Sequence, residues 1–153
     1  VIAGQALDGA RGLETGLEVQ PRWIQAVGVI SLGLNAGYHR SSAADRLLVY
    51  GLRGAYQAKW FTNQWVVPVI GYSMGKVAYK LPSGSSGSIP SAGLFYGLRF
   101  FLSAADPDAA AEFYNGYDVS RVYLTLETTQ RSGADSNLSL AGRSTSVGLR
   151  FEL

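Results

Sequence analysis

The sequence has no cysteine among its 153 residues and only one histidine. The absence of cysteine excludes a disulfide scaffold and any cysteine-ligated zinc or iron–sulfur site. Charged residues are also scarce, at 16% of the chain, and the net charge is +2. Because no cluster of Lys and Arg exceeds two neighbours, we expect no nucleic-acid partner. No metal site, phosphate loop or cofactor motif can be identified, so we expect no metal and no cofactor.

Long apolar runs are missing as well. Although 47% of the residues are hydrophobic, no stretch approaches the ~18 consecutive apolar residues that a membrane-spanning helix needs. Glycine is frequent, with 19 residues, and each interior glycine costs a helix roughly 1 kcal/mol relative to alanine. The glycine content therefore argues against a helical bundle, and the apolar content excludes a disordered chain. The length is that of a single domain, residues 1–153.

What the chain does have is an alternation of apolar and polar residues, the period-two pattern of β-strands. This pattern predicts seven strands, at residues 12–20, 26–38, 46–58, 65–79, 92–103, 119–131 and 141–153. A closed antiparallel sheet needs an even number of strands. We therefore expect residues 1–7 to supply an eighth strand, joined to the next by the hairpin dipeptide Asp8-Gly9. A β-bulge is expected between Gly71 and Gly75, where the alternation is unclear.

The segments between the strands carry turn signals. In an up-and-down sheet these segments alternate between the two ends. Residues 80–91 are expected to connect two strands as a loop, and residues 80–88, rich in Ser and Gly, are expected to be its flexible part. Residues 106–112 predict a short helix, with Asp106 as its N-cap and Pro107 at the first helical position.

Alternation alone fits a soluble barrel with an apolar interior or a membrane barrel with an apolar exterior. The predicted strands, of about 9 to 15 residues, are long enough to span a bilayer. Their polar face combines many small residues with five basic and four acidic groups, which nearly balance and are expected to pair in a narrow interior. These are Glu14, Glu18, Arg53, Lys59, Arg99, Arg121, Glu127, Arg150 and Glu152. The pattern favours the membrane barrel.

Bulky aromatic residues gather at one end of the predicted barrel, where an aromatic girdle would meet the membrane–water interface. They are Trp23, Trp60, Phe61, Trp65, Phe100, Phe101 and Phe151. Tyr38, Tyr50 and Tyr79 are expected at the opposite rim. An alternative interpretation of Trp60, Phe61 and Trp65 is a local hydrophobic cluster that closes a hairpin.

The last eight residues, 146–153, resemble the β-signal of bacterial outer-membrane barrels, in which a glycine, an aromatic residue and a bulky terminal residue recur at fixed spacing. Gly148, Phe151 and Leu153 occupy these positions, with Leu in place of the commoner Phe at the end. The whole chain is similar in architecture to the small eight-stranded family of the OmpA and OmpX type. The resemblance implies a closed antiparallel up-and-down transmembrane β-barrel in the bacterial outer membrane, with both termini periplasmic.

The resemblance also implies partners, namely outer-membrane lipid, lipopolysaccharide and the barrel assembly machinery, which would receive the C-terminal strand. An eight-stranded barrel is just filled by its side chains. We therefore expect a structural envelope protein or a barrel subunit that docks to a larger envelope complex. One alternative is a small gated channel for ions or hydrophobic solutes, lined by Arg53, Arg99, Arg121 and Glu127.

A second alternative is a lipid A-modifying enzyme. The segment His39-Arg40-Ser41 resembles the His-x-Ser pair of lipid A deacylases, which would require a nucleophile beside a base. In that family the pair lies on a late strand facing lipid, whereas here it lies early, and the alternation turns His39 inward. The nearest acidic residue in the sequence is Asp45. We therefore expect no enzymatic activity, with His39 and Ser41 as the only catalytic candidates.

Overall fold

The computed structural model describes residues 11–20, 28–41, 44–61, 64–134 and 138–152. Within these residues the protein is a sheet of seven antiparallel strands in chain order, each hydrogen-bonded to the next. The strands are β1 (Arg11–Val19), β2 (Val29–Arg40), β3 (Arg46–Gln57), β4 (Val66–Lys80), β5 (Ser86–Phe101), β6 (Arg121–Ser132) and β7 (Gly142–Glu152). The prediction of an all-β, up-and-down architecture is confirmed, and all seven predicted strands are present.

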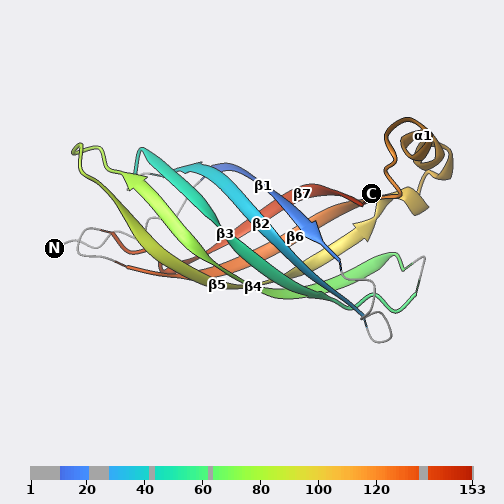
Figure 1. The fold of residues 1–153 in the computed structure, drawn as a ribbon, viewed down its shortest axis with the longest axis horizontal. Coiled ribbons are helices and arrows are strands. Elements are labelled where there is room, and N and C mark those ends of the chain that lie inside the picture. Colours follow the sequence, from blue (N-terminus) through green and yellow to red (C-terminus); the bar gives the residue numbers. More distant parts are fainter. Residues whose placement is uncertain (1–10, 21–27, 42–43, 62–63, 135–137, 153) are drawn as a thin grey trace.

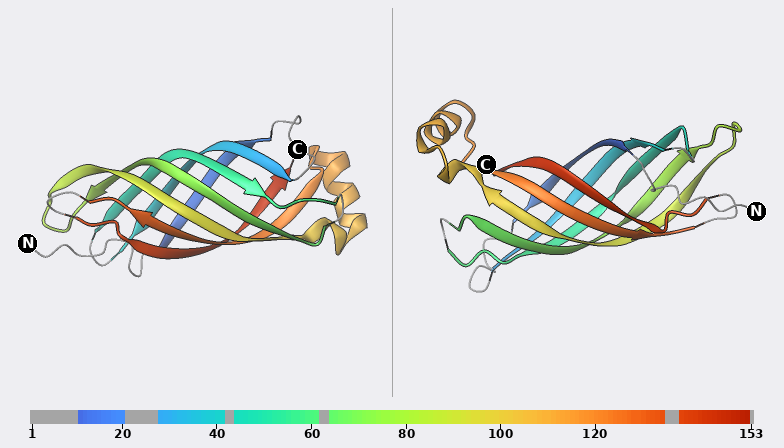
Figure 2. Two further views of the ribbon diagram at one scale, coloured as in Figure 1. Left: turned by 90° about the horizontal axis from the view of Figure 1, so that it is seen from below. Right: turned by 180° about the vertical axis from the view of Figure 1, so that it is seen from behind.

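The sheet curls strongly about its long axis into a half-barrel with β1 and β7 as its edges (Figure 1). Figure 2 shows the same curl from two further directions, with the strands inclined to the long axis. The predicted closure into an eight-stranded barrel is not present among the described residues. Residues 1–7 and the turn Asp8-Gly9, which were expected to supply the eighth strand, lie outside that part of the chain.

The loop predicted at residues 80–91 is wrong over much of its length, because β5 begins at Ser86, paired with Lys80. The chain reverses within residues 81–85, where the Leu81 amide donates to the Ser85 carbonyl at 2.8 Å. A Ser- and Gly-rich composition predicts a loop, but Ile89 of the same segment is fully buried in a cluster with Tyr79. Burial of this side chain and the backbone ladder outweigh the local composition.

The β-bulge predicted between Gly71 and Gly75 is also wrong, because β4 pairs with both neighbours without an inserted residue. Gly75 lies opposite Gly51 of β3, and a Cβ added to Gly75 would lie 2.6 Å from the Gly51 Cα. The two glycines let the backbones approach on the concave side. The sheet can therefore curve here without a bulge.

One helix follows β5 after the short 3₁₀ turn η1 (Leu102–Ala104). The helix α1 (Pro107–Tyr117) confirms the predicted helix and extends it by five residues. The Asp106 carboxylate caps it by accepting from the Ala109 amide at 3.0 Å. The helix lies at the end of the sheet where the C-terminal strand ends (Figure 1). No helix in the described part of the chain is long and apolar enough to cross a membrane.

The two faces of the sheet have opposite character. Apolar side chains cover the convex face and are exposed, for example Leu13 at 84%, Leu17 at 79% and Leu52 at 57%. The concave face carries the ion-paired charged residues together with three apolar clusters. The largest closes the interior at the end opposite α1 and consists of Ala44, Leu47, Val49, Val77, Tyr79, Ile89, Leu138 and Leu140. Sequence alternation predicted the polar part of this interior and missed its apolar parts.

Candidate functional site

The centre of the concave face holds five charged side chains, which we call the central charge cluster. They come from five different strands and are Glu18, Arg53, Arg99, Glu127 and Arg150. Arg150 Nη1 donates to Glu18 Oε2 at 2.5 Å. Arg99 Nη2 lies 3.8 Å from Glu18 and 3.6 Å from Glu127, and Arg53 pairs with both carboxylates. Arg99 is only 2% exposed, so it depends on these partners for its charge balance.

Glycines on the neighbouring strands make room for the two carboxylates. Gly33 stands opposite Glu18, and a Cβ there would lie 2.7 Å from the Glu18 Cγ. Gly97 stands in the same way opposite Glu127, at 2.9 Å from its Cγ. The Arg53 guanidinium stacks on Phe95, with its carbon 3.7 Å from the ring centroid. Glycines opposite Glu18 and Glu127 therefore leave the space that the side chains of the central charge cluster occupy.

A second group of charges lies at the end of the interior nearest α1. The Glu152 carboxylate accepts from Lys59 Nζ at 3.2 Å and from Gln20 Nε2 at 3.1 Å. Arg121 Nη1 lies 3.6 Å from the same carboxylate. The Lys59 ammonium is 5.4 Å from the ring centroid of Tyr123. One carboxylate at the end of β7 therefore binds groups from three other segments of the chain.

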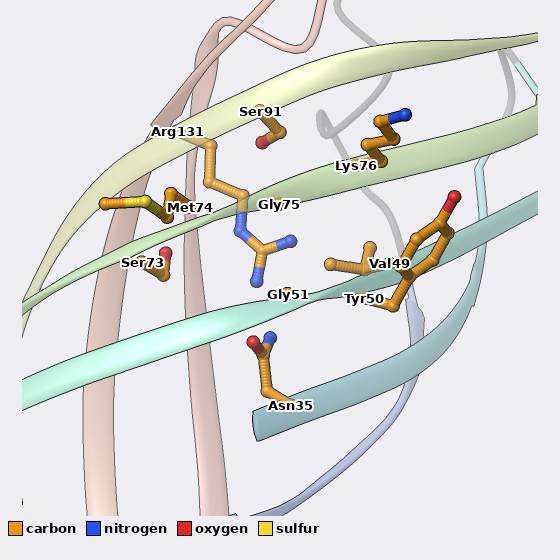
Figure 3. Close-up of a pocket in the computed structure, with 10 residues that line it drawn as sticks. All are labelled: Asn35, Val49, Tyr50, Gly51, Ser73, Met74, Gly75, Lys76, Ser91 and Arg131. Carbon is orange, nitrogen blue, oxygen red and sulfur yellow. The ribbon is translucent and has the colours of Figure 1, made fainter. Parts of the chain in front are cut away.

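A third group lies toward the opposite end. Glu14 Oε1 accepts from Arg131 Nη2 at 3.0 Å and from Asn35 Nδ2 at 2.8 Å. Figure 3 shows the Arg131 guanidinium pointing into the pocket beside this group, on the side of Asn35, whereas Lys76 and Tyr50 point away from it. The cavity volume is about 10 Å³, roughly the space of one water molecule. The pocket is too small for a substrate or an open pore.

All nine charged residues predicted for the interior lie on the concave side, and each takes part in an ion pair. Arg131, the partner of Glu14, was missed because the sequence places it where a turn was expected to begin. The alternation of β6 nevertheless continues from Arg121 to Arg131, two residues at a time. Following the alternation two steps beyond Glu127, through Thr129, would have identified Arg131.

The two catalytic candidates do not form a catalytic pair. His39 faces the interior from β2, where its ring and the Glu14 side chain both border Gly37. Its acidic neighbour is therefore Glu14 of β1 rather than Asp45. The Ser41 hydroxyl accepts from the Ala44 amide at 3.2 Å and closes a turn. Among the described residues no hydrogen bond joins His39 to Ser41, and no group of three His, Cys, Asp or Glu side chains could hold a metal.

The aromatic residues near α1 lie mainly on the outside. Trp60, Phe61 and Trp65 are 60%, 71% and 60% exposed, around the turn that joins β3 to β4. Phe151 is exposed and Phe100 is half-buried, both on the convex face, whereas Trp23 lies outside the described residues.

Two aromatic residues predicted at the rims face the interior instead. Phe101 is buried and stacks on Tyr123, with ring centroids 5.2 Å apart. Tyr79 is also buried, in the apolar cluster with Ile89 at the opposite end. Both occupy the alternate positions of their strands whose side chains point to the interior. The rim prediction used only their location near a strand end, which does not show on which face a side chain lies.

Gly148 and Phe151 of the C-terminal motif lie in β7, and Leu153 falls outside the described residues. Gly148 is on the concave side beside Thr125, and Phe151 is on the convex side. β7 is one of the two edge strands, with β6 as its hydrogen-bonded neighbour.

No protein-family model matches the chain, and no curated protein or solved structure has a significant match to it.

Proposed function

We propose that the chain forms a closed, eight-stranded β-barrel of the bacterial outer membrane, with a filled interior and a structural or docking role in the envelope. The observation that carries this proposal is the reversed polarity of the sheet. Its convex face exposes apolar side chains, and its concave face holds paired charges. A soluble half-barrel would bury its apolar face and expose its charges.

The apolar exterior is continuous across the strands. The register aligns Leu17, Leu34, Leu52 and Met74 from β1 to β4, and all four are at least half exposed. A contiguous apolar surface of this kind on a soluble protein favours aggregation. Hydrocarbon chains would cover it without loss of hydration energy, as on the outer face of a membrane barrel.

The strand lengths support the same proposal. The six strands from β2 to β7 have 11 to 16 residues. A strand tilted by about 45° needs ~9–11 residues to cross the hydrocarbon layer. The exposed aromatic residues Trp60, Phe61 and Trp65 lie beyond the strand ends, at the level expected for a membrane interface.

Closure of the barrel is part of the proposal. In an up-and-down sheet β1 and β7 run in the same direction, so an antiparallel strand between them would pair with both edges. Side chains already connect the two edges, because Arg150 bonds Glu18 and Glu152 bonds Gln20. An eighth strand would satisfy the edge backbone groups, which a bilayer cannot hydrate.

The location and partners follow from this assignment. We propose that the strand surface contacts outer-membrane lipid and lipopolysaccharide, and that β7 is recognised by the barrel assembly machinery. Both termini would lie in the periplasm. The acidic and aromatic helix α1, on the C-terminal side, would then be positioned to contact other envelope proteins.

The filled interior supports a structural role over a channel. Three salt-bridged groups and three apolar clusters occupy the concave side, and the cavity beside Arg131 holds about 10 Å³. The contacts of Ser41 support a non-enzymatic role, because its hydroxyl oxygen accepts from a turn amide and is not paired with His39.

Electrophoretic mobility of the detergent-solubilised protein, with and without boiling, tests the proposal. We expect a heat-dependent shift, because a closed barrel stays folded in detergent until heated. A protein that is soluble and monodisperse without detergent would overturn the membrane assignment.

Two further measurements test the role. In planar bilayers we expect no steady single-channel steps, and steps abolished by Arg99→Gln would replace the structural role with a channel. Lipid A is expected to have the same mass with and without the protein, and a changed mass would establish an enzyme.

A further inference from the structure

A row of exposed cations crosses the convex face at the end opposite α1. Arg46 begins β3 and stands directly opposite Lys80, the last residue of β4. Arg40 ends β2, one residue beyond the pair His39 and Leu47, which places it beside Arg46. All three are exposed and alternate with inward-facing neighbours. The row therefore spans three adjacent strands at the edge of the apolar exterior.

Like charges at such positions repel one another. Directly opposed residues of an antiparallel pair have Cβ atoms about 5 Å apart, and like charges there are destabilising. No salt bridge among the described residues joins Arg40, Arg46 or Lys80 to an acid, although the Asp45 carboxylate lies close enough to interact with Arg40. One carboxylate does not balance three cations. An anion bound across the row would relieve the repulsion.

Tyr38 organises the row for such an anion. Arg40 Nε donates to the Tyr38 hydroxyl at 2.7 Å, and the guanidinium carbon lies 5.6 Å from the centroid of the same ring. These contacts orient the Arg40 guanidinium through its Nε. A planar fork of this kind matches the oxygens of a phosphate.

A shallow apolar groove lies on the same face, toward the middle of the strands. Its volume is about 570 Å³, and its outward side chains include Leu52, Met74, Pro90 and Ala92. Lys76 borders it from β4, four residues before Lys80, and points away from the interior (Figure 3). The small residues Ala92 and Ser132 leave the hollow between the larger side chains. The groove suits an acyl chain, and Lys76 adds a cation at its border.

We propose that the row of Arg40, Arg46 and Lys80 binds the phosphate-bearing headgroup of a lipid from the surrounding bilayer, with an acyl chain in the groove. The inference rests on the membrane assignment proposed above and specifies where an anionic lipid binds. The groove distinguishes a lipid from free phosphate, because it supplies an apolar contact that inorganic phosphate would not use. The position of the row fits a headgroup, since it lies where the apolar exterior ends.

Native mass spectrometry of the full chain, released from detergent micelles, tests this inference. The probes are phosphatidic acid, diacylglycerol with the same acyl chains, and inorganic phosphate. We expect phosphatidic acid to remain bound and the other two to be lost. Equal retention of diacylglycerol would overturn the role of the phosphate, and retention of inorganic phosphate with no preference for the lipid would overturn the role of the groove.

Substitution of the row cations by Gln shows which residues bind the lipid headgroup. The Arg46→Gln variant is expected to bind phosphatidic acid about fivefold more weakly, because each cation near a charged lipid surface contributes a similar factor. The triple variant Arg40→Gln, Arg46→Gln and Lys80→Gln is expected to bind at least ~tenfold more weakly. Arg143→Gln removes one exposed cation from β7, outside the row, and is the matched control.

Two results separate this inference from the membrane assignment. If the heat-dependent mobility shift is present but the triple variant and the Arg143→Gln control bind phosphatidic acid as well as the unmodified chain, the lipid site is wrong and the barrel stands. If the protein is soluble without detergent, the barrel itself fails. The mobility shift of each variant also shows that it is folded, so loss of binding reports on the row.

Discussion

Arg150 of β7 donates a 2.5 Å hydrogen bond to the Glu18 carboxylate of β1, although 132 residues separate the two in the chain. The two strands are the edges of the sheet and are not hydrogen-bonded to each other through their backbones. Side chains therefore join the edges across the interior. A second contact, from Gln20 to Glu152, does the same nearer α1.

The Glu18→Gln variant is expected to lose about 3 kcal/mol in the free energy of unfolding, because Arg99 and Arg150 then lack their shared carboxylate in a buried site. Urea unfolding in detergent, followed by tryptophan fluorescence, measures this loss. The control is Glu112→Gln, an exposed position on α1, which is expected to change stability by less than ~0.5 kcal/mol. An equal effect of both substitutions would contradict a structural role for the central charge cluster.

The Leu52→Arg variant tests the apolar exterior. Leu52 lies near the middle of β3 on the convex face, where an arginine at bilayer mid-depth is expected to destabilise the barrel by about 2 to 4 kcal/mol. Val66→Arg, at the start of β4 and near the interface, is expected to cost about 0 to 1 kcal/mol. Equilibrium unfolding in lipid vesicles measures both. Similar small effects at the two positions would indicate a water-exposed surface.

Substitution of Gly75 tests the close approach of β3 and β4. A Cβ at this position would lie 2.1 Å from the Tyr50 carbonyl oxygen, so Gly75→Ala must displace backbone. We expect a loss of roughly 1 to 3 kcal/mol in the free energy of unfolding. Gly116 of α1 has no atom within 4 Å of an added Cβ, and Gly116→Ala is expected to stabilise the helix by about 1 kcal/mol. Opposite signs for the two variants are the expected outcome.

The N-cap of α1 can be tested without disturbing the sheet. Asp106→Ala removes the acceptor for the Ala109 amide, and loss of such a cap costs about 1 kcal/mol of helix stability. Amide hydrogen exchange is expected to speed up in α1 and to remain unchanged in β5 and β6. Asp106→Ser keeps a capping oxygen and is expected to restore protection. Faster exchange in the Ser variant as well would show that the cap is not the stabilising contact.

The strands were predictable because period-two alternation depends only on which face each residue occupies. It placed Ile30, Leu32 and Leu34 on one side, and the structure does the same. The start of β5 was not predictable from composition, because Ser86 and Ser88 have no local preference for a strand. Their pairing with β4 and the burial of Ile89 determine it. Tertiary contacts therefore determine where β5 begins, which the local sequence pattern does not specify.

For the candidate site, parity was sufficient to place charges on one face but not to choose their partners. Glu14 pairs with Arg131, and Glu18 with Arg150, through strands that are distant in sequence. These pairings depend on the stagger and curvature of the sheet, which no single strand encodes. The apolar clusters inside, such as Val67 with Phe101 and Tyr123, were missed for a related reason. Phe101 and Tyr123 lie near strand ends, where the alternation cannot be checked on both sides.

The meander topology has a consequence for the order of folding. Every backbone pairing joins strands that are neighbours in the chain, so the sheet can grow hairpin by hairpin with short loop closures. The bonds Arg150–Glu18 and Gln20–Glu152 each close a loop of 132 residues and have the largest entropic cost, so they form late. Interactions that form after the transition state govern the unfolding rate. The central charge cluster is therefore expected to slow unfolding. Its loss would shorten the lifetime of the folded protein, while the folding rate would stay nearly constant.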